Sequence, residues 1–189
     1  IVYNEICKID MFKDVKIAEL GNSKNVAMGD FVVAVGELYG FADSMGCGMV
    51  TGASVTVSDT DSEFKIITTD IIGSASSFGV LANIKGQITG IITPNYNTGT
   101  SNLISAYAME EVAGIVEKLM NGVKTTYLGI RGLSVSYGKN SSGKDLMGIY
   151  VSSIESNSPA YYAGLQPGDI IVSVGKKKTT TMKQFMDAL

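Results

Sequence analysis

Short apolar runs alternate with turn residues through the first half of the chain. Valine, isoleucine and threonine dominate the runs, while glycine, asparagine, aspartate and serine separate them. β-Branched residues in short runs bounded by such turn residues are typical of strands. The expected strands cover residues 31–35, 49–51, 54–57, 65–68, 80–82 and 88–92. About six strands are enough for a small closed antiparallel barrel, which leaves no strand edge unpaired.

The pattern changes after this β-rich region. A polar stretch at 94–102 predicts an exposed loop. Ser105 is a candidate N-cap for a helix, and Gly122 lies where a C′ glycine would end that helix. Apolar residues recur between them at helical spacing: Met109, Val112, Ile115, Val116 and Leu119. We therefore predict one domain at 1–121 and a second at 122–189.

The second region mixes strand and helix signals. Strand patterns occur at 128–136, 148–154 and 170–174. Ser158 followed by Pro159 opens a short helix between the last two of them, and another helix begins near Thr181. The region therefore predicts a small α+β domain.

The composition limits the chemistry that these residues can perform by themselves. The 189 residues include no histidine, so they cannot alone form a Ser-His-Asp site, a Cys-His site or a histidine-containing zinc site. Cys7 and Cys47 are too few for an all-cysteine metal site. We expect two buried thiols, with a single disulfide as the alternative. The sequence thus predicts no metal and no cofactor.

The charge pattern excludes some partners. There are 15 Lys and Arg residues against 18 Asp and Glu residues, and Arg131 is the single arginine, so we expect no nucleic-acid binding. No apolar run approaches the roughly 20 residues that span a bilayer. The chain begins at Ile1, with neither an initiator methionine nor a signal peptide, which indicates a piece of a longer protein.

An acidic group falls between two expected strands. Asp59, Asp61 and Glu63 alternate like the first ligands of a calcium loop, but Phe64 stands where that loop needs glycine. We predict a solvated hairpin tip instead.

Several motifs occur in a fixed order along the first domain. They read AELGNS at 18–23, GDFVVAVG at 29–36, GMVT at 48–51, TD at 69–70, SSFGVL at 76–81 and GQITGI at 86–91. This series resembles the HtrA/DegP-type trypsin-like serine proteases. The resemblance implies a mainly β fold, in which a six-stranded trypsin-like antiparallel β-barrel is followed by a helix and an α+β PDZ domain.

The resemblance also places a degenerate catalytic site. Ser77 matches the nucleophile, and Ala75 matches an oxyanion-hole position. Ala75 and Phe78 replace glycines of the family pattern, whose flexibility turns N–H groups toward the oxyanion. The catalytic aspartate would fall at Tyr3, or at Asn4 in the neighbouring register, and neither is a carboxylate. These departures predict a proteolytically inactive domain.

The second region resembles the PDZ domain that follows the protease in this family. The matching motifs are SPA at 158–160, AGL at 163–165 and PGDII at 167–171. The resemblance implies a loop that binds a peptide carboxylate through backbone N–H groups. That loop would consist of Tyr127, Leu128, Gly129 and Ile130, with the last three supplying the N–H groups.

A side-chain pocket for the peptide is expected beside this loop. Met182, Met186 and Leu189 are spaced i, i+4 and i+7 and would share one helix face that lines the pocket. Phe185 points elsewhere and is predicted to belong to the core. Methionines at the pocket favour apolar C-terminal residues with modest selectivity, although the same methionines could simply pack the domain.

Three functions remain as hypotheses. The first is an inactive HtrA-like scaffold that binds peptides or unfolded protein C-termini through its PDZ domain. The second is an active serine endopeptidase of protein quality control whose histidine and aspartate lie upstream. The third is a structural module that assembles as a homo-oligomer. The family resemblance implies an extracytoplasmic location, at the cell surface or in the periplasm.

Overall fold

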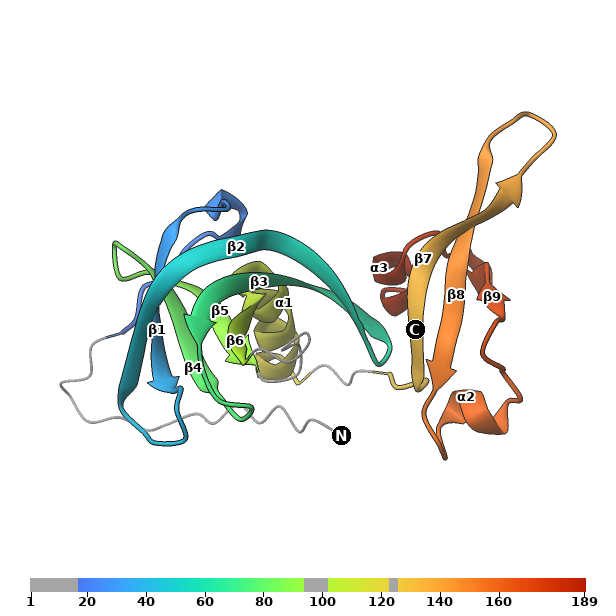
Figure 1. The fold of residues 1–189 in the computed structure, drawn as a ribbon. Coiled ribbons are helices and arrows are strands. Elements are labelled where there is room, and N and C mark those ends of the chain that lie inside the picture. Colours follow the sequence, from blue (N-terminus) through green and yellow to red (C-terminus); the bar gives the residue numbers. More distant parts are fainter. Residues whose placement is uncertain (1–16, 94–101, 123–125) are drawn as a thin grey trace. The chain divides into compact units, whose positions relative to one another are not determined.

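A computed structural model describes residues 17–93, 102–122 and 126–189. The chain divides into two compact units, the first made of Ile1–Val55 and Lys65–Lys124 and the second of Thr56–Phe64 and Thr125–Leu189 (Figure 1). Tyr3, Asn4, Cys7 and most of the loop expected at 94–102 lie outside the described residues.

The first unit is a closed barrel with the strand order β1-β2-β3-β6-β5-β4. Its strands are β1 (Phe31–Glu37), β2 (Ser44–Asp59), β3 (Ser62–Ile72), β4 (Phe78–Asn83), β5 (Ile88–Thr93) and β6 (Leu103–Ala108). The pairings of β1 with β2 and β4, and of β6 with β3 and β5, are antiparallel. A short 3-10 helix, η1 (Ser23–Asn25), precedes the barrel, and α1 (Met109–Met120) follows it. The predicted six-stranded antiparallel barrel is confirmed.

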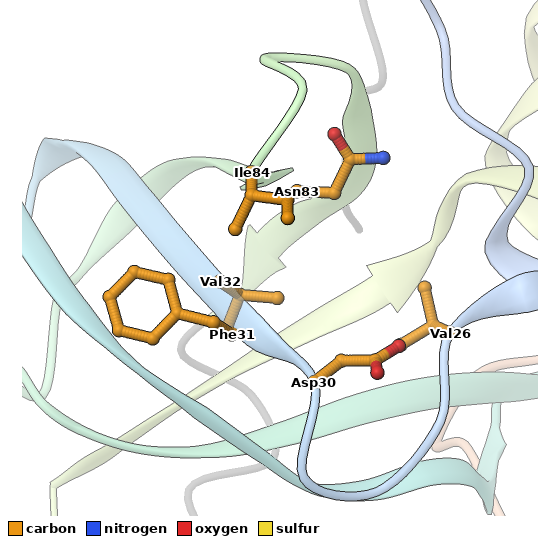
Figure 2. A pocket seen from close by; sticks show the side chains of 6 residues that line it. All are labelled: Val26, Asp30, Phe31, Val32, Asn83 and Ile84. Atoms are coloured by element: carbon orange, nitrogen blue, oxygen red, sulfur yellow. The ribbon is translucent and has the colours of Figure 1, made fainter.

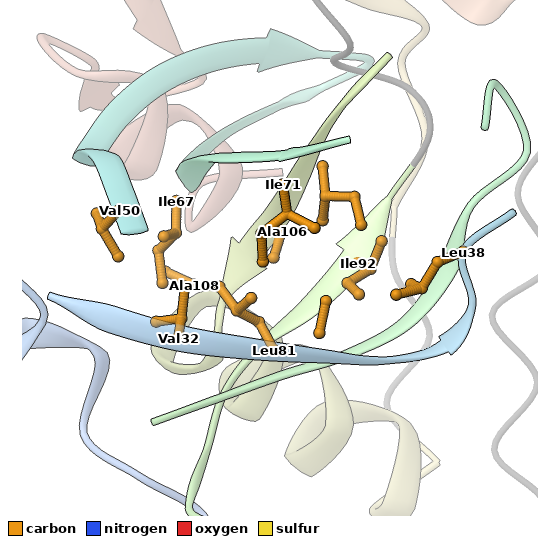
Figure 3. Close-up of a cluster of buried hydrophobic side chains, with 11 residues drawn as sticks. Val32, Leu38, Val50, Ile67, Ile71, Leu81, Ile92, Ala106 and Ala108 are labelled. Carbon is orange, nitrogen blue, oxygen red and sulfur yellow. The ribbon is translucent and has the colours of Figure 1, made fainter. Parts of the chain in front are cut away.

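The barrel core arises from the alternation of side chains along each strand. In β1, Val32 and Ala34 are buried while Phe31 and Val35 are exposed, because successive residues of a strand face opposite sides of the sheet. Figure 3 shows the buried apolar cluster, to which all six strands contribute. It consists of Val32, Ala34, Leu38, Val50, Ile67, Ile71, Leu81, Ile92, Ile104, Ala106 and Ala108.

Two details of the barrel differ from the sequence prediction. The runs at 49–51 and 54–57 belong to one continuous strand, β2. The prediction of Ser105 as an N-cap is wrong, because Ser105 is buried in β6, opposite Thr68 of β3 and Thr93 of β5. Pairing on both sides makes this segment the strand that closes the barrel. The helix ends as predicted, since Gly122 has φ +64° just after α1.

The second unit contains a three-stranded antiparallel sheet in the order β7-β8-β9, so that β7 forms one edge. Its elements are β7 (Ile130–Lys139), β8 (Asp145–Ile154), α2 (Pro159–Tyr162), β9 (Ile170–Ile171), β10 (Ser173–Val174), β11 (Lys177–Lys178) and α3 (Met182–Met186). Ser158 caps α2 by accepting the Tyr161 N–H, and Pro159 fits the first helical position because that position needs no N–H donor.

A separate core holds the second unit together. Its fully buried members come from β7, β8, α2 and α3, and they are Ile130, Ile149, Val151, Ala160, Met182 and Phe185. The hairpin formed by β2 and β3 ends in a turn that belongs to this unit, and we call Thr56–Phe64 the hairpin tip.

Candidate functional site

The loop between β3 and β4 contains Ser77, the position that matches a protease nucleophile. The side chain is buried, with 2% of the residue exposed. Its Oγ lies 2.7 Å from the Leu38 carbonyl oxygen, to which it donates, and it accepts the Ser74 N–H at 2.8 Å. The hydroxyl is therefore hydrogen-bonded to the backbone of its own loop at Ser74 and to the backbone after β1 at Leu38, and it is shielded from solvent.

The backbone N–H of Ser77 is also used in a hydrogen bond inside this loop. The Ser77 N–H, which would point at an oxyanion in an acyl-transfer site, donates to the Ser74 carbonyl at 3.2 Å. Ala75 is exposed, and Phe78 is 56% exposed. The loop therefore forms a closed turn around Ser77, a feature that the sequence motif did not reveal.

A pocket in the first unit lies elsewhere, between the start of β1 and the end of β4. Figure 2 shows its lining side chains, which are Val26, Asp30, Phe31, Val32, Asn83 and Ile84. Its ionisable group, Asp30, accepts the Ala27 N–H at 2.8 Å and so stabilises its own turn. The pocket is mainly apolar and brings together no acid, base and nucleophile.

Cys47 also differs from expectation. It is exposed on β2, where we expected a buried thiol. Its strand position explains the exposure, because Val50 and Ser44 of the same strand point inward while Cys47 and Met49 point outward.

The second unit brings together the three N–H groups of the predicted carboxylate loop, which we define as Tyr127–Ile130. The N–H of Leu128 lies 2.7 Å from Asp61 Oδ2, and that of Ile130 lies 3.0 Å from Asp61 Oδ1. The Gly129 N–H lies 3.0 Å from Oδ1 and 2.8 Å from Oδ2. Three convergent N–H donors form a site for an anionic carboxylate. In this structure the carboxylate in the site is that of Asp61, which belongs to the hairpin tip.

Local hydrogen bonds and one glycine fix the shape of the carboxylate loop. The Leu128 carbonyl accepts the Ala160 N–H, and the Gly129 carbonyl accepts the Glu155 N–H, each at 2.9 Å. Gly129 has φ +87°, and a Cβ there would overlap the Ser158 side chain. Only glycine fits this turn without strain, which explains the residue at the centre of the loop.

The prediction that the acidic hairpin tip is solvated is wrong. Asp61 is only 8% exposed, because its carboxylate is enclosed by the N–H groups of the carboxylate loop. Sequence reasoning missed this contact because its partners are 67 to 69 residues away along the chain. Tyr127, at the start of the loop, is 52% exposed.

The helix expected to line a side-chain pocket is short. Met182 and Met186 lie in α3, but the helix ends at the C-cap Asp187, so Leu189 lies beyond it rather than on a third turn. Met182 is fully buried in the same core as Phe185 and has no exposed surface in this structure. Met186 and Leu189 are half-buried, and Leu189 packs against that core.

Two features are absent from the described part of the chain. None of its helices is both long and apolar enough to cross a bilayer. In the same residues, no three side chains of histidine, cysteine, aspartate or glutamate are grouped as metal ligands.

The two units together indicate a class of protein in which a protease-type barrel is followed by a PDZ-type domain. A family model described as "PDZ domain" matches residues 150–189. The chain is 31% identical to serine protease HTRA1 of Xenopus tropicalis over 187 residues, which cover 90% of this chain and 40% of that protein. It is 30% identical to a probable periplasmic serine endoprotease, DegP-like, of Buchnera aphidicola over 190 residues, covering 89% of this chain and 39% of that protein.

A solved structure agrees with these relatives in fold. The HtrA-type protease AlgW with a decapeptide matches with a TM-score of 0.57 and 21% identity, covering 94% of this chain and 57% of that one. The chain is therefore an HtrA/DegP-type serine protease homologue with a PDZ domain. It spans about 40% of the length of the curated relatives named above.

Proposed function

We propose that this chain is a proteolytically inactive HtrA-type homologue that binds peptides by their C-terminal carboxylates. The convergence of the Leu128, Gly129 and Ile130 N–H groups carries the proposal. These groups lie at the start of β7, an edge strand to which an extended peptide can add. The AlgW structure with a decapeptide supports peptide binding by this type of protein. The relative named as periplasmic favours an extracytoplasmic location.

Carboxylate capture predicts a preference for peptides with a free C-terminus. We expect a short peptide ending in leucine to bind about tenfold or more tightly than its amidated form, because amidation removes a charged acceptor of several N–H groups. Fluorescence anisotropy with the whole chain measures both affinities. Equal affinity for the two peptides would contradict carboxylate capture.

The inactivity of the barrel is supported by the burial of Ser77 and by the internal use of its hydroxyl and N–H. We expect no stoichiometric labelling of Ser77 by a fluorophosphonate, in this chain or in its full-length form, because the reagent reacts with an accessible, activated serine. Peptide mapping by mass spectrometry locates any label. A full equivalent of label on Ser77 would favour the alternative of an active serine endopeptidase.

A stability measurement complements the labelling. Ser77→Ala should lower the free energy of unfolding by about 1–3 kcal/mol, since buried backbone groups lose their hydrogen-bond partner. Ser76→Ala is the matched control, because Ser76 is exposed in the same loop and its loss should cost less than about 0.5 kcal/mol. Equal effects of the two changes in urea unfolding would show that Ser77 has no structural role.

A further inference from the structure

We propose that Asp61 is an internal ligand of the carboxylate loop and that a C-terminal peptide binds only by displacing it. This inference rests on the proposed function, because it assigns a competitor to the same site. The hairpin tip and the carboxylate loop belong to the same compact unit of the structure.

The carboxylate of Asp61 is placed as a peptide terminus would be. Oδ1 accepts from Gly129 and Ile130, and Oδ2 accepts from Leu128 and Gly129, at distances of 2.7 to 3.0 Å. An ionised carboxylate that is removed from water needs such donors to offset its lost hydration. Three N–H groups satisfy both oxygens, which explains how Asp61 is tolerated at 8% exposure.

The backbone of the hairpin tip also pairs with β7, as the backbone of a bound peptide would. The Asp61 N–H donates to the Ile130 carbonyl at 2.7 Å, and Thr60 forms an antiparallel bridge with Arg131. Further along, Ser58 Oγ donates to the Gly132 carbonyl at 2.8 Å. The tip therefore runs antiparallel along the edge of β7 and ends with a carboxylate in the loop, as a strand-adding peptide does.

The chain must turn away after Asp61, because this internal ligand has no terminus. Asp61 adopts φ +54°, a left-handed conformation that aspartate, asparagine and glycine tolerate better than other residues. Aspartate thus supplies both the turn and the carboxylate. The side chain stands in for the terminal carboxylate, so the tip offers no large apolar side chain at that end.

Side chains around Arg131 hold the tip in this position. Arg131 lies 3.3 Å from Asp59 Oδ1 and 3.4 Å from Glu155 Oε1, and Thr60 Oγ1 donates to the same Glu155 oxygen at 3.0 Å. Each pair is partly exposed and therefore weak by itself. Together they restrict the tip, and a tethered ligand acts at an effective concentration on the order of millimolar or more.

The competition defines which ligands can enter. A free carboxylate alone offers the loop no more than Asp61 already gives, so small carboxylic acids should not displace the tip. A peptide gains an advantage through apolar burial, because the Asp61 side chain has a single methylene to bury. A peptide can therefore displace the tip only where contacts beyond its carboxylate add to its affinity.

The test compares whole-chain variants in binding a short fluorescein-labelled peptide of alanine and serine that ends in leucine with a free carboxylate. Asp61→Gly removes the internal carboxylate while keeping the left-handed turn, and Asp61→Asn keeps its size but not its charge. We expect both to bind the peptide more tightly than the wild type, by about tenfold for Asp61→Gly, because a largely occupied site lowers the apparent affinity by its free fraction. Glu63→Ala, the matched control, removes one charge from the same tip and should bind like the wild type.

Hydrogen exchange of the Leu128, Gly129 and Ile130 amides gives a second readout that needs no peptide. It should accelerate in Asp61→Gly, whereas exchange in β8 should not change. Unchanged or weaker peptide binding by both Asp61 variants, with a wild type that binds, would overturn the internal ligand and leave the proposed function intact. If no variant binds the peptide, the proposed function fails. Faster amide exchange would then still support the internal contact, and unchanged exchange would overturn it.

Discussion

Gly79→Ala is expected to lower the free energy of unfolding of the barrel by about 3–5 kcal/mol. This cost is the sum of two effects: alanine is strained in a backbone conformation that is nearly exclusive to glycine, and its Cβ overpacks the space between two strands. Gly79 of β4 pairs directly with Gly36 of β1, and their φ values are +145° and +153°. A Cβ on Gly79 would overlap the Val35 carbonyl oxygen and lie 2.8 Å from the Gly36 Cα. These neighbours are backbone atoms of a paired strand, so they cannot move aside as a flexible side chain can.

Gly86→Ala is the control for a glycine in the ordinary left-handed region whose replacement causes no steric overlap. Gly86 also has a positive φ, +78°, but a Cβ there would meet no atom within 4 Å. We therefore expect a cost of only about 1–2 kcal/mol, the usual penalty of a left-handed residue. Urea unfolding followed by circular dichroism, with hydrogen exchange to identify the barrel transition, measures both variants. Equal costs would contradict the close approach of β1 and β4.

Phe185→Ala is expected to lower the free energy of unfolding of the second unit by about 3–5 kcal/mol, the range found for large aromatic residues removed from a core. Phe185 is fully buried, and it is the largest of the six fully buried apolar residues that form this core among the residues that the structure describes. Small domains are only marginally stable, so this loss should unfold the second unit at denaturant concentrations that leave the barrel folded.

Lys183→Ala provides the matched control in the same helix. Lys183 is exposed in α3, and alanine favours helix, so its replacement should change the stability by less than about 0.5 kcal/mol. Hydrogen exchange followed by mass spectrometry reports the two units separately. If Phe185→Ala and Lys183→Ala gave the same exchange in β7 and β8, Phe185 would not be the main support of this core.

Local patterns predicted much of the fold. The alternation of Val32 and Ala34 with exposed neighbours marked β1, and the Ser158-Pro159 pair marked the start of α2. Capping and strand alternation depend on residues within a few positions, so they can be read from sequence. The ordered motifs then identified the HtrA/DegP type.

Long-range contacts decided what local patterns left open. The segment Leu103–Ala108 has no strong strand signal, yet it forms β6 because β3 and β5 offer it hydrogen bonds on both sides. Ser77 matched a nucleophile by motif, but its buried hydroxyl donates to the Leu38 carbonyl, 39 residues earlier. The spacing of nearby residues reveals neither the strands that pair with Leu103–Ala108 nor the carbonyl that accepts from Ser77.

The sequence by itself predicted a small antiparallel barrel and the type of protein, because most strands and the ordered motifs depend on short-range patterns, but it did not identify β6, the strand between β3 and β5. Only the tertiary structure revealed that Ser77 is turned inward and that Asp61 lies in the carboxylate loop. Both outcomes depend on a polar group meeting a distant backbone partner inside the fold. A buried hydroxyl or carboxylate is stable only where such a partner exists, and folding alone brings the two together.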